Sequence, residues 1–357
     1  MKNKKTTQDS QDKKSQDILR DYKKSGKLRP WKKRKTLTEV LSKACSCIPG
    51  LEKYGERMSG CGSYMEFDEC RSVKHGKTLV RASFCGYRLC VNCQSRKATL
   101  VRKQVLDLAT WHLEKYSSDV PILLTLTVPN VKGEDIGKTI DRMAKAYERL
   151  SRRKIVKRMN RSWFKSLEIT YNHDRNDFHP HFHILMMVPP NYFDKESGLY
   201  ITRDEWLRLW QEAMRDESIT QVDIRRVEEK GEGTLGAIIA EVAKYATKPS
   251  SYIFEDGQGN FDVVRKVLES LHYGIKGRRF VGYGGYFKEV RKEKKLLNLE
   301  KAELSAKEVE DVIDANGVVK EKSPPCCKIC NEPMVRGVYQ WDRELKDHVR
   351  VQCRGPT

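Results

Sequence analysis

A short run of alternating histidines limits how the middle of this chain can fold. Residues 179–185 read His-Pro-His-Phe-His-Ile-Leu, so His181 and His183 flank one bulky apolar residue. In a β-strand alternate side chains point to the same face, which places the two imidazoles side by side and Phe182 on the other face. Two imidazoles at that spacing can share one divalent cation. The simpler alternative is a pair of polar residues on a half-exposed strand, because short motifs also match by chance.

The residues before this run predict a β-hairpin that adds a carboxylate to the same face. A polar turn over 172–177 separates two strand-like runs, and Glu168 is the only carboxylate within the first of them. If Glu168 pairs with His181 or His183, the turn is centred near Arg175, inside the polar loop. The three side chains then form a ligand set that suits Mg²⁺ or Mn²⁺. A β-bulge in either strand would shift this register.

A second segment places a tyrosine beside charged side chains. We expect a helix that is capped by Thr234 and stopped by Pro249. Glu241, Tyr245 and Lys248 stand at positions i, i+4 and i+7, so they share one face of this helix. A tyrosine next to a carboxylate and a lysine can act as a nucleophile. The alternative, favoured if the histidine pair is ignored, is a surface tyrosine beside an ordinary ion pair.

The 11 cysteines fall into two clusters that are separated by the long stretch between Cys93 and Cys326. In a reducing compartment this pattern predicts metal sites, not disulfides. Cys90 and Cys93 form a C-x-x-C pair, the usual turn that brings two thiolates to one ion. We expect a structural Zn²⁺ held by Cys61, Cys85, Cys90 and Cys93, with Cys70 as an alternative to Cys61. The remaining alternative is that these are ordinary cysteines.

The C-terminal tail contains a second C-x-x-C pair, Cys327 and Cys330. His348 and Cys353 follow in the same short segment and complete a set of four zinc-ligand types. We therefore expect a small second zinc module built from Cys327, Cys330, His348 and Cys353, with ordinary cysteines as the equally weighted alternative.

The balance of charge predicts the kind of partner. The formal net charge is +20 over 357 residues, while hydrophobic residues make up 38%, enough for a core. A surplus of this size points to a polyanion, most often nucleic acid, with an anionic membrane surface as the weaker alternative. The sequence contains neither a transmembrane-length apolar run nor the apolar core of a signal peptide. We expect a cytoplasmic protein that binds DNA.

Three segments in this order resemble the rolling-circle replication initiators of small bacterial plasmids, which belong to the His-hydrophobe-His endonuclease superfamily. They are Leu-Leu-Thr-Leu-Thr-Val-Pro at 123–129, the histidine run at 179–185, and Glu-Val-Ala-Lys-Tyr-Ala-Thr-Lys at 241–248. The run Arg-Leu-Cys-Val-Asn-Cys at 88–93 is also similar to the cysteine segment of that family, with Val91 where proline is common. The resemblance covers roughly residues 60–290.

The resemblance implies an α+β fold, with an antiparallel ferredoxin-like sheet, helices on one face and the catalytic ion on the sheet. It assigns His181 and His183 as ligands of Mg²⁺ or Mn²⁺ and Tyr245 as the nucleophile, which forms a 5′-phosphotyrosine bond and leaves a 3′-OH primer. Glu241 matches the single-tyrosine branch, in which a carboxylate activates water at termination. Lys248 would orient the phosphate or the tyrosine.

The implied function is site-specific nicking and joining of DNA at the double-strand origin of a plasmid, supercoiled or locally single-stranded, with a host helicase and polymerase as partners. The alternatives are a transposase or mobilisation relaxase with the same chemistry, or a non-catalytic zinc-dependent DNA-binding repressor. The expected order of segments is a basic disordered arm (1–44), a cysteine-rich zinc-binding segment (45–104), the endonuclease domain (105–290), a charged helical connector (291–322) and a C-terminal cysteine module (323–357).

Overall fold

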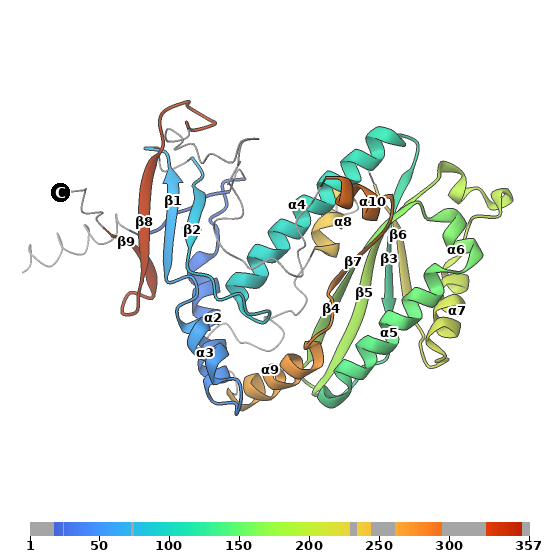
Figure 1. Ribbon diagram of the computed structural model, residues 1–357, viewed down its shortest axis with the longest axis horizontal. Coiled ribbons are helices and arrows are strands. Elements are labelled where there is room, and N and C mark those ends of the chain that lie inside the picture. Colours follow the sequence, from blue (N-terminus) through green and yellow to red (C-terminus); the bar gives the residue numbers. More distant parts are fainter. Residues whose placement is uncertain are drawn as a thin grey trace, which may run out of the picture. The chain divides into compact units, whose positions relative to one another are not determined.

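The computed structural model describes residues 18–23, 25–72, 75–228, 234–243, 261–294 and 326–351. The chain divides into two compact units. Residues 1–93 and 303–357 form unit 1, and residues 94–302 form unit 2. Each unit contains an antiparallel β-sheet together with helices (Figure 1). The α+β class is confirmed, although the sequence predicted one sheet and the structure contains two.

The sheet of unit 2 has five strands in the order β6-β3-β5-β4-β7, and every neighbouring pair is antiparallel. The strands are β3 (Val120–Thr127), β4 (Ser162–Asn172), β5 (Asp177–Val188), β6 (Val222–Arg226) and β7 (Val281–Gly285). Helix α5 (Ile136–Ser151) connects β3 to β4, and α7 (Arg203–Met214) lies between β5 and β6. The central strand β5, which carries the histidines, is held between β3 and β4.

Strands β4 and β5 form the expected hairpin, and Glu168 lies directly opposite His181. Strand β5 begins before the histidine pair and also includes Pro180. The N–H of Phe178 donates to the carbonyl of Val131 on the β3 side, so by alternation the nitrogen of Pro180 faces that side too. There the β3 ladder has already ended at His181, so the proline interrupts no ladder hydrogen bond.

Helices cover both faces of this sheet, whereas the sequence predicted helices on one face only (Figure 1). On one face Tyr147 of α5 packs edge-on against Phe182, with ring centroids 6.1 Å apart. On the other face α4 (Val91–Lys115), α8 (Leu235–Val242) and α10 (Tyr286–Glu293) contribute buried side chains to a single cluster. The difference arises because each of these three helices has an apolar stripe of its own, which the sheet buries.

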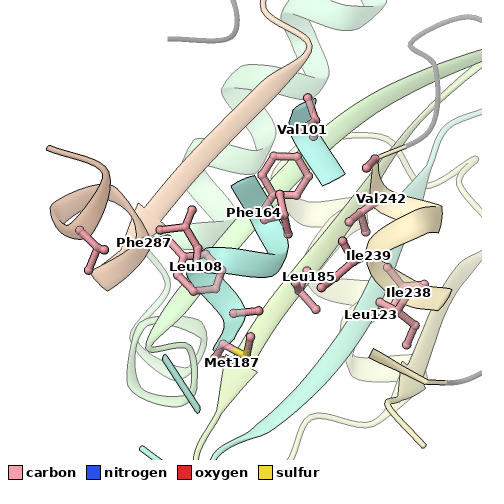
Figure 2. Packing of buried hydrophobic residues seen from close by; sticks show 14 residues of the cluster. Val101, Leu108, Leu123, Phe164, Leu185, Met187, Ile238, Ile239, Val242 and Phe287 are labelled. Carbon is pink, nitrogen blue, oxygen red and sulfur yellow. The ribbon is translucent and has the colours of Figure 1, made fainter. Parts of the chain in front are cut away.

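Figure 2 shows this cluster, which includes Leu185 and Met187 of β5. By alternation along the strand, these two residues lie on the same face as His181 and His183. The side chains come from α4 (Val101, Leu108), the strands (Leu123, Phe164, Leu185, Met187), α8 (Ile238, Ile239, Val242) and α10 (Phe287). All of them are at most 4% exposed. Burial of this kind contributes about 1.5–3 kcal/mol per large apolar side chain. The packing fixes α8 against the strand that carries the histidines.

The remaining helices of unit 2 complete the described part of the domain. The stretch between β3 and β4 contains α5 and the short α6 (Lys154–Met159). Helix α7 begins with a capping box, in which Thr202 and Glu205 bond reciprocally. Helix α9 (Phe261–Ile275) follows residues that lie outside the described part of the chain.

Unit 1 brings together residues from both ends of the sequence. Its sheet has the order β2-β1-β8-β9, formed by β1 (Tyr64–Glu69), β2 (Thr78–Ala82), β8 (Val335–Asp342) and β9 (Asp347–Val351). Strands β1 and β8 pair antiparallel from Tyr64 opposite Gln340 to Glu69 opposite Val335. The described residues of the tail therefore share a sheet with the cysteine-rich segment, where the sequence predicted a separate module. Residues 295–325, which include most of the expected connector, lie outside the described part.

The expected disordered arm over 1–44 differs from the structure from Ile18 onward, because Leu19 is buried and its N–H donates to the carbonyl of His348 at 2.9 Å. Residues 31–46 form helix α2 (Trp31–Ser46), which is followed by α3 (Glu52–Ser59). Buried positions of α2 include polar residues, so the helix shows little apolar periodicity in the sequence. Lys35 donates from Nζ to the carbonyl of Ser59 at 2.7 Å, and Ser42 donates from Oγ to the carbonyl of Gly55 at 2.7 Å. Residues 1–17 lie outside the described part.

Candidate active site and metal centres

Three buried side chains converge on the α8 face of the unit 2 sheet. Nε2 of His181 lies 3.3 Å from Oε2 of Glu168, and Nε2 of His183 lies 3.0 Å from the same oxygen. Each of the three residues is less than 10% exposed. One ligand atom from each residue lies within 4.8 Å of the others, which is the spacing that one ion requires. The sheet register produces this arrangement, because Glu168 faces His181 across the hairpin and His183 follows two residues later.

A hydrogen bond on the outer side of His181 fixes its tautomer, and a hydroxyl occupies the same place beside His183. Nδ1 of His181 donates to the carbonyl of His179 at 3.1 Å, and this carbonyl can only accept. Nδ1 of His183 lies 3.2 Å from the hydroxyl oxygen of Thr125 on β3. When a cation lies between the three side chains, a neutral imidazole with Nδ1 protonated turns its Nε2 lone pair toward that cation. Two nitrogen lone pairs that converge on one point suit a bound cation. Hydrogen-bond partners on the opposite ring nitrogen commonly orient metal-binding histidines.

The charge of the carboxylate fits the same interpretation. Burial alone would raise the pKa of Glu168, but the adjacent imidazoles of His181 and His183 outweigh it and hold the pKa well below its usual range. Glu168 is therefore ionised at neutral pH. Two imidazole nitrogens and one carboxylate leave open positions on an ion such as Mg²⁺ or Mn²⁺.

Glu241, the last but one residue of α8, reaches the same place. Its Oε1 lies 3.9 Å from Nε2 of His183, and its side chain is 35% exposed. The structure thus brings together four of the residues that the sequence singled out for the active site. Tyr245 and Lys248 lie outside the described residues.

Sequence analysis did not give a role to Thr125 or to the carbonyl of His179, which orient the two imidazoles. The available signal was the alternation along β3, since Thr125 occupies the strand position that pairs with His183. The pairing of Thr125 with His183 depends on the register between β3 and β5, two strands that are distant in sequence. Local pattern alone could not fix that register.

Unit 1 contains a buried cluster of four cysteines, Cys61, Cys85, Cys90 and Cys93. Sγ–Sγ distances are 3.4 Å for Cys61 and Cys90, 3.6 Å for Cys85 and Cys93, and 3.7 Å for Cys61 and Cys93. Cys61 follows α3, Cys85 follows β2, and the C-x-x-C pair lies at the start of α4. A tetrahedral site with Zn–S bonds of about 2.3 Å has sulfur–sulfur separations of about 3.8 Å.

The surroundings of these thiols also suit a cation. Hydrogen bonds with neighbouring thiols raise the pKa of Cys61 and Cys93, so the four groups do not all ionise unless a positive charge joins them. Asn92 donates from Nδ2 to the carbonyl of Cys61 at 3.3 Å. The donor set and the burial are consistent with a closed structural zinc site.

The cysteines of the tail meet different partners from those expected. Cys327 and Cys330 cluster with Cys70 and His75, so Cys70 does not complete the first tetrad. His348 does not join them, because it is buried and its Nε2 lies 2.7 Å from the carbonyl of Gly62. Cys353 lies outside the described residues. His75 was missed, although its position five residues after Cys70 is a spacing found among zinc ligands.

The fold and the site define the class of the protein. It is an α+β protein in which one antiparallel sheet carries a cluster of two histidines and one carboxylate, and a separate unit contains cysteine clusters with the composition of zinc sites. Residues 76–325 match the family described as "Replication protein". The chain therefore belongs to this family of replication proteins. The resemblance to replication initiators that the sequence motifs indicated is confirmed at this level.

Several curated proteins are similar to this chain over most of their length. "Protein rep" of Streptococcus pneumoniae serotype 2 is 34% identical over 287 residues, covering 80% of this chain and 86% of that protein. "Protein rep" of Bacillus amyloliquefaciens is 33% identical over 325 residues, covering 84% and 92%. "Protein rep" of a Bacillus species is 35% identical over 277 residues, covering 71% and 84%. No solved structure matches the chain. Among the described residues, no helix combines the length and the apolar character needed to span a membrane.

Proposed function

We propose that this protein initiates rolling-circle replication of a plasmid by nicking one strand at the double-strand origin through Tyr245. The observation that carries the proposal is the meeting of Glu168, His181 and His183 with Glu241 on one face of the sheet. Glu241 belongs to α8, and Tyr245 follows it by four residues in the sequence. Membership of the replication-protein family and the net charge of +20 support a DNA substrate.

The ordering of the sheet supports the same proposal. Apart from the short α6 and the 3₁₀ turns, strands and helices follow one another as β3, α5, β4, β5, α7 and β6, and these four strands are arranged as β6-β3-β5-β4. This β-α-β-β-α-β succession is that of ferredoxin-like sheets. It is the core that the sequence resemblance implies, with the histidines on its central part.

The chemistry needs one nucleophile and one place for a phosphate. A Mg²⁺ or Mn²⁺ ion held by Glu168, His181 and His183 would polarise the scissile phosphodiester. The phenolic oxygen of Tyr245 gives up its proton to solvent and attacks the phosphorus, and its bond to phosphorus forms as the bond from phosphorus to the 3′ oxygen breaks. The 3′ oxygen takes a proton and leaves as a 3′-OH primer. Lys248 adds positive charge that orients the phosphate or the tyrosine.

The bond energy of the phosphodiester is kept in the 5′-phosphotyrosine link, so the strand can be rejoined later. We assign Glu241 to termination, where its carboxylate accepts a proton from a water molecule that attacks the phosphodiester in place of a second tyrosine. The water oxygen bonds to phosphorus as the bond to the 3′ oxygen breaks, and the 3′ oxygen takes up a proton. The partial exposure of Glu241 and its position beside His183 suit a base that meets solvent. A host helicase and polymerase would extend the primer.

An adduct assay tests the proposal directly. Purified full-length protein is incubated with supercoiled plasmid that carries its own gene and flanking DNA, with Mn²⁺ or Mg²⁺, and then denatured. We expect protein covalently attached to a DNA 5′ end, and no adduct with EDTA, with Tyr245→Phe or with the double variant His181→Ala plus His183→Ala. Tyr273→Phe is the matched control, because this tyrosine on α9 is 51% exposed and outside the cluster.

Each contrary result identifies a different error. An adduct that survives Tyr245→Phe moves the nucleophile to another residue. An adduct that forms without the two histidines removes the catalytic role of the ion. Tight, specific binding to the same DNA without any adduct favours a zinc-dependent DNA-binding repressor.

A further inference from the structure

Besides the tetrad of Cys61, Cys85, Cys90 and Cys93, the described part of the chain contains a second cluster of metal-ligand types that the nicking chemistry does not use. It consists of Cys70, His75, Cys327 and Cys330. The cluster lies in unit 1, and its four residues come from segments at opposite ends of the sequence. Cys70 and Cys330 are 260 positions apart, and His75 and Cys327 are 252 apart.

The four ligand atoms lie at the spacing of a tetrahedral ion. Nδ1 of His75 is 3.3 Å from Sγ of Cys70 and 3.4 Å from Sγ of Cys327, and the sulfurs of Cys70 and Cys330 are 3.4 Å apart. Bonds of about 2.0–2.3 Å from one zinc to nitrogen and sulfur place ligands about 3.5–3.8 Å apart. All three cysteines are free thiols.

The backbone around Cys327 and Cys330 is already folded as a ligand turn. The N–H of Asn331 donates to the carbonyl of Cys327 at 2.8 Å, and the N–H of Cys327 donates to the carbonyl of Glu332 at 2.8 Å. Asn331 has φ of +58°, the left-handed conformation that closes such a turn. Cys327 and Cys70 are buried against Met334, so one side of the cluster is sealed from solvent.

The position of the cluster in the sheet gives it a structural consequence. Cys70 directly follows the last residue of β1, and the turn that contains Cys327 and Cys330 precedes β8. The β1–β8 ladder ends at Glu69 opposite Val335, so the cluster lies just beyond the end of this ladder. His75 lies in the connection from β1 to β2, and the set therefore joins three segments of unit 1.

We propose that Cys70, His75, Cys327 and Cys330 hold a second structural zinc ion, which fastens the C-terminal hairpin β8–β9 to strand β1. Three thiolates and one imidazole form a closed donor set that zinc prefers. The ion acts as a cross-link between the two ends of the chain and leaves the endonuclease sheet unchanged.

Zinc counting on the purified full-length protein tests this proposal. The count is made by mass spectrometry of metals in the His181→Ala plus His183→Ala background, so that zinc in the proposed catalytic site does not contribute. We expect two zinc ions per chain, and one after Cys330→Ser or His75→Ala. The matched control is Cys326→Ser, because Cys326 is an exposed neighbour outside the cluster and its loss should leave two.

A variant in the other tetrad distinguishes the loss of one zinc site from general misfolding. Cys90→Ser, in the other tetrad, should also retain one zinc, and that ion should be lost when Cys330→Ser is added. One zinc per chain that does not respond to Cys330→Ser or His75→Ala would overturn the proposal, as would a Cys90→Ser protein without zinc.

Hydrogen exchange then tests the fastening itself. Cys330→Ser should speed amide exchange in β8 at residues 335–340 at least tenfold, while amides of β3 and β5 keep their protection. Equal protection of β8 with and without the ion would show that the zinc, although bound, does not hold the hairpin.

Discussion

Thr125→Val should weaken metal binding without touching a ligand. The hydroxyl oxygen of Thr125 is 3.2 Å from Nδ1 of His183, and it accepts the Nδ1 proton in the tautomer that binds a metal through Nε2. Valine has almost the same shape, so the strand and the imidazole can keep their positions. The imidazole loses its outer partner, and with it the preference for the tautomer that presents Nε2 to the ion.

The magnitude follows from the geometry of this bond. Losing an outer-shell partner of a metal-binding histidine costs about 10- to 100-fold in affinity. A 3.2 Å contact between neutral groups is at the long end of the hydrogen-bond range, and such bonds contribute about 0.5–1.5 kcal/mol. We therefore expect an effect at the lower end of the 10- to 100-fold range. Thr125→Val should bind Mn²⁺ about tenfold more weakly, which is a loss of about 1.4 kcal/mol in binding free energy.

Calorimetric titration of the full-length protein with Mn²⁺ measures the effect. The nicking assay should agree, with half-saturation at about tenfold higher Mn²⁺ and a maximal rate that is nearly restored when the metal saturates. Thr127→Val is the matched control, because Thr127 lies on the same face of β3 but donates to the carbonyl of Gln221 at 2.8 Å. Unchanged affinity in Thr125→Val, or an equal loss in Thr127→Val, would refute the role assigned to this hydroxyl.

Three further predictions concern stability and are measured by urea unfolding. Leu185→Ala removes a fully buried side chain from the core under α8 and should lower the free energy of unfolding by about 2–5 kcal/mol. Gly337→Ala places a methyl group 2.3 Å from Oε1 of the buried Glu69 and should cost about 1–3 kcal/mol, whereas Gly60→Ala, with open space around it, should be nearly neutral. Burial lowers the pKa of His112, so the unfolded chain binds the proton first and stability should fall as pH drops below about 6.5. His112→Gln should flatten that decline, and an unchanged slope would show that another group causes it.

The hairpin of the candidate active site could be predicted because its determinants are local. A period of two along β5, a polar turn and a single carboxylate in β4 leave few registers, and the one that places Glu168 opposite His181 is observed. The capping box of α7 is equally local. Helices on the second face of the sheet were not predicted, because which face a helix covers depends on contacts between distant segments.

The ligand sets show the same limit more sharply. Each C-x-x-C pair predicts two of the four ligands of a tetrahedral metal site, but the sequence does not identify the distant residues that supply the other two. Proximity in sequence favoured His348 for the tail, yet His348 is buried in unit 1 against the carbonyl of Gly62. Cys70 and His75, far away in sequence, take its place in the cluster. Spacing predicts the kind of site, and the fold selects its members.

The arrangement of unit 1 has a consequence for how this part of the protein forms. Strand β1 obtains one of its two neighbours from β8, which is made about 270 residues later. Pairing over such a separation is slow to form, because the loop must close before any contact compensates for the lost chain entropy. The sheet of unit 1 thus depends on the end of the chain, whereas the strands of unit 2 all lie within residues 120–285. Truncation after residue 325 should therefore disturb the N-terminal cysteine-rich unit first, and the histidine-bearing sheet, whose contacts are contained in unit 2, should keep its fold.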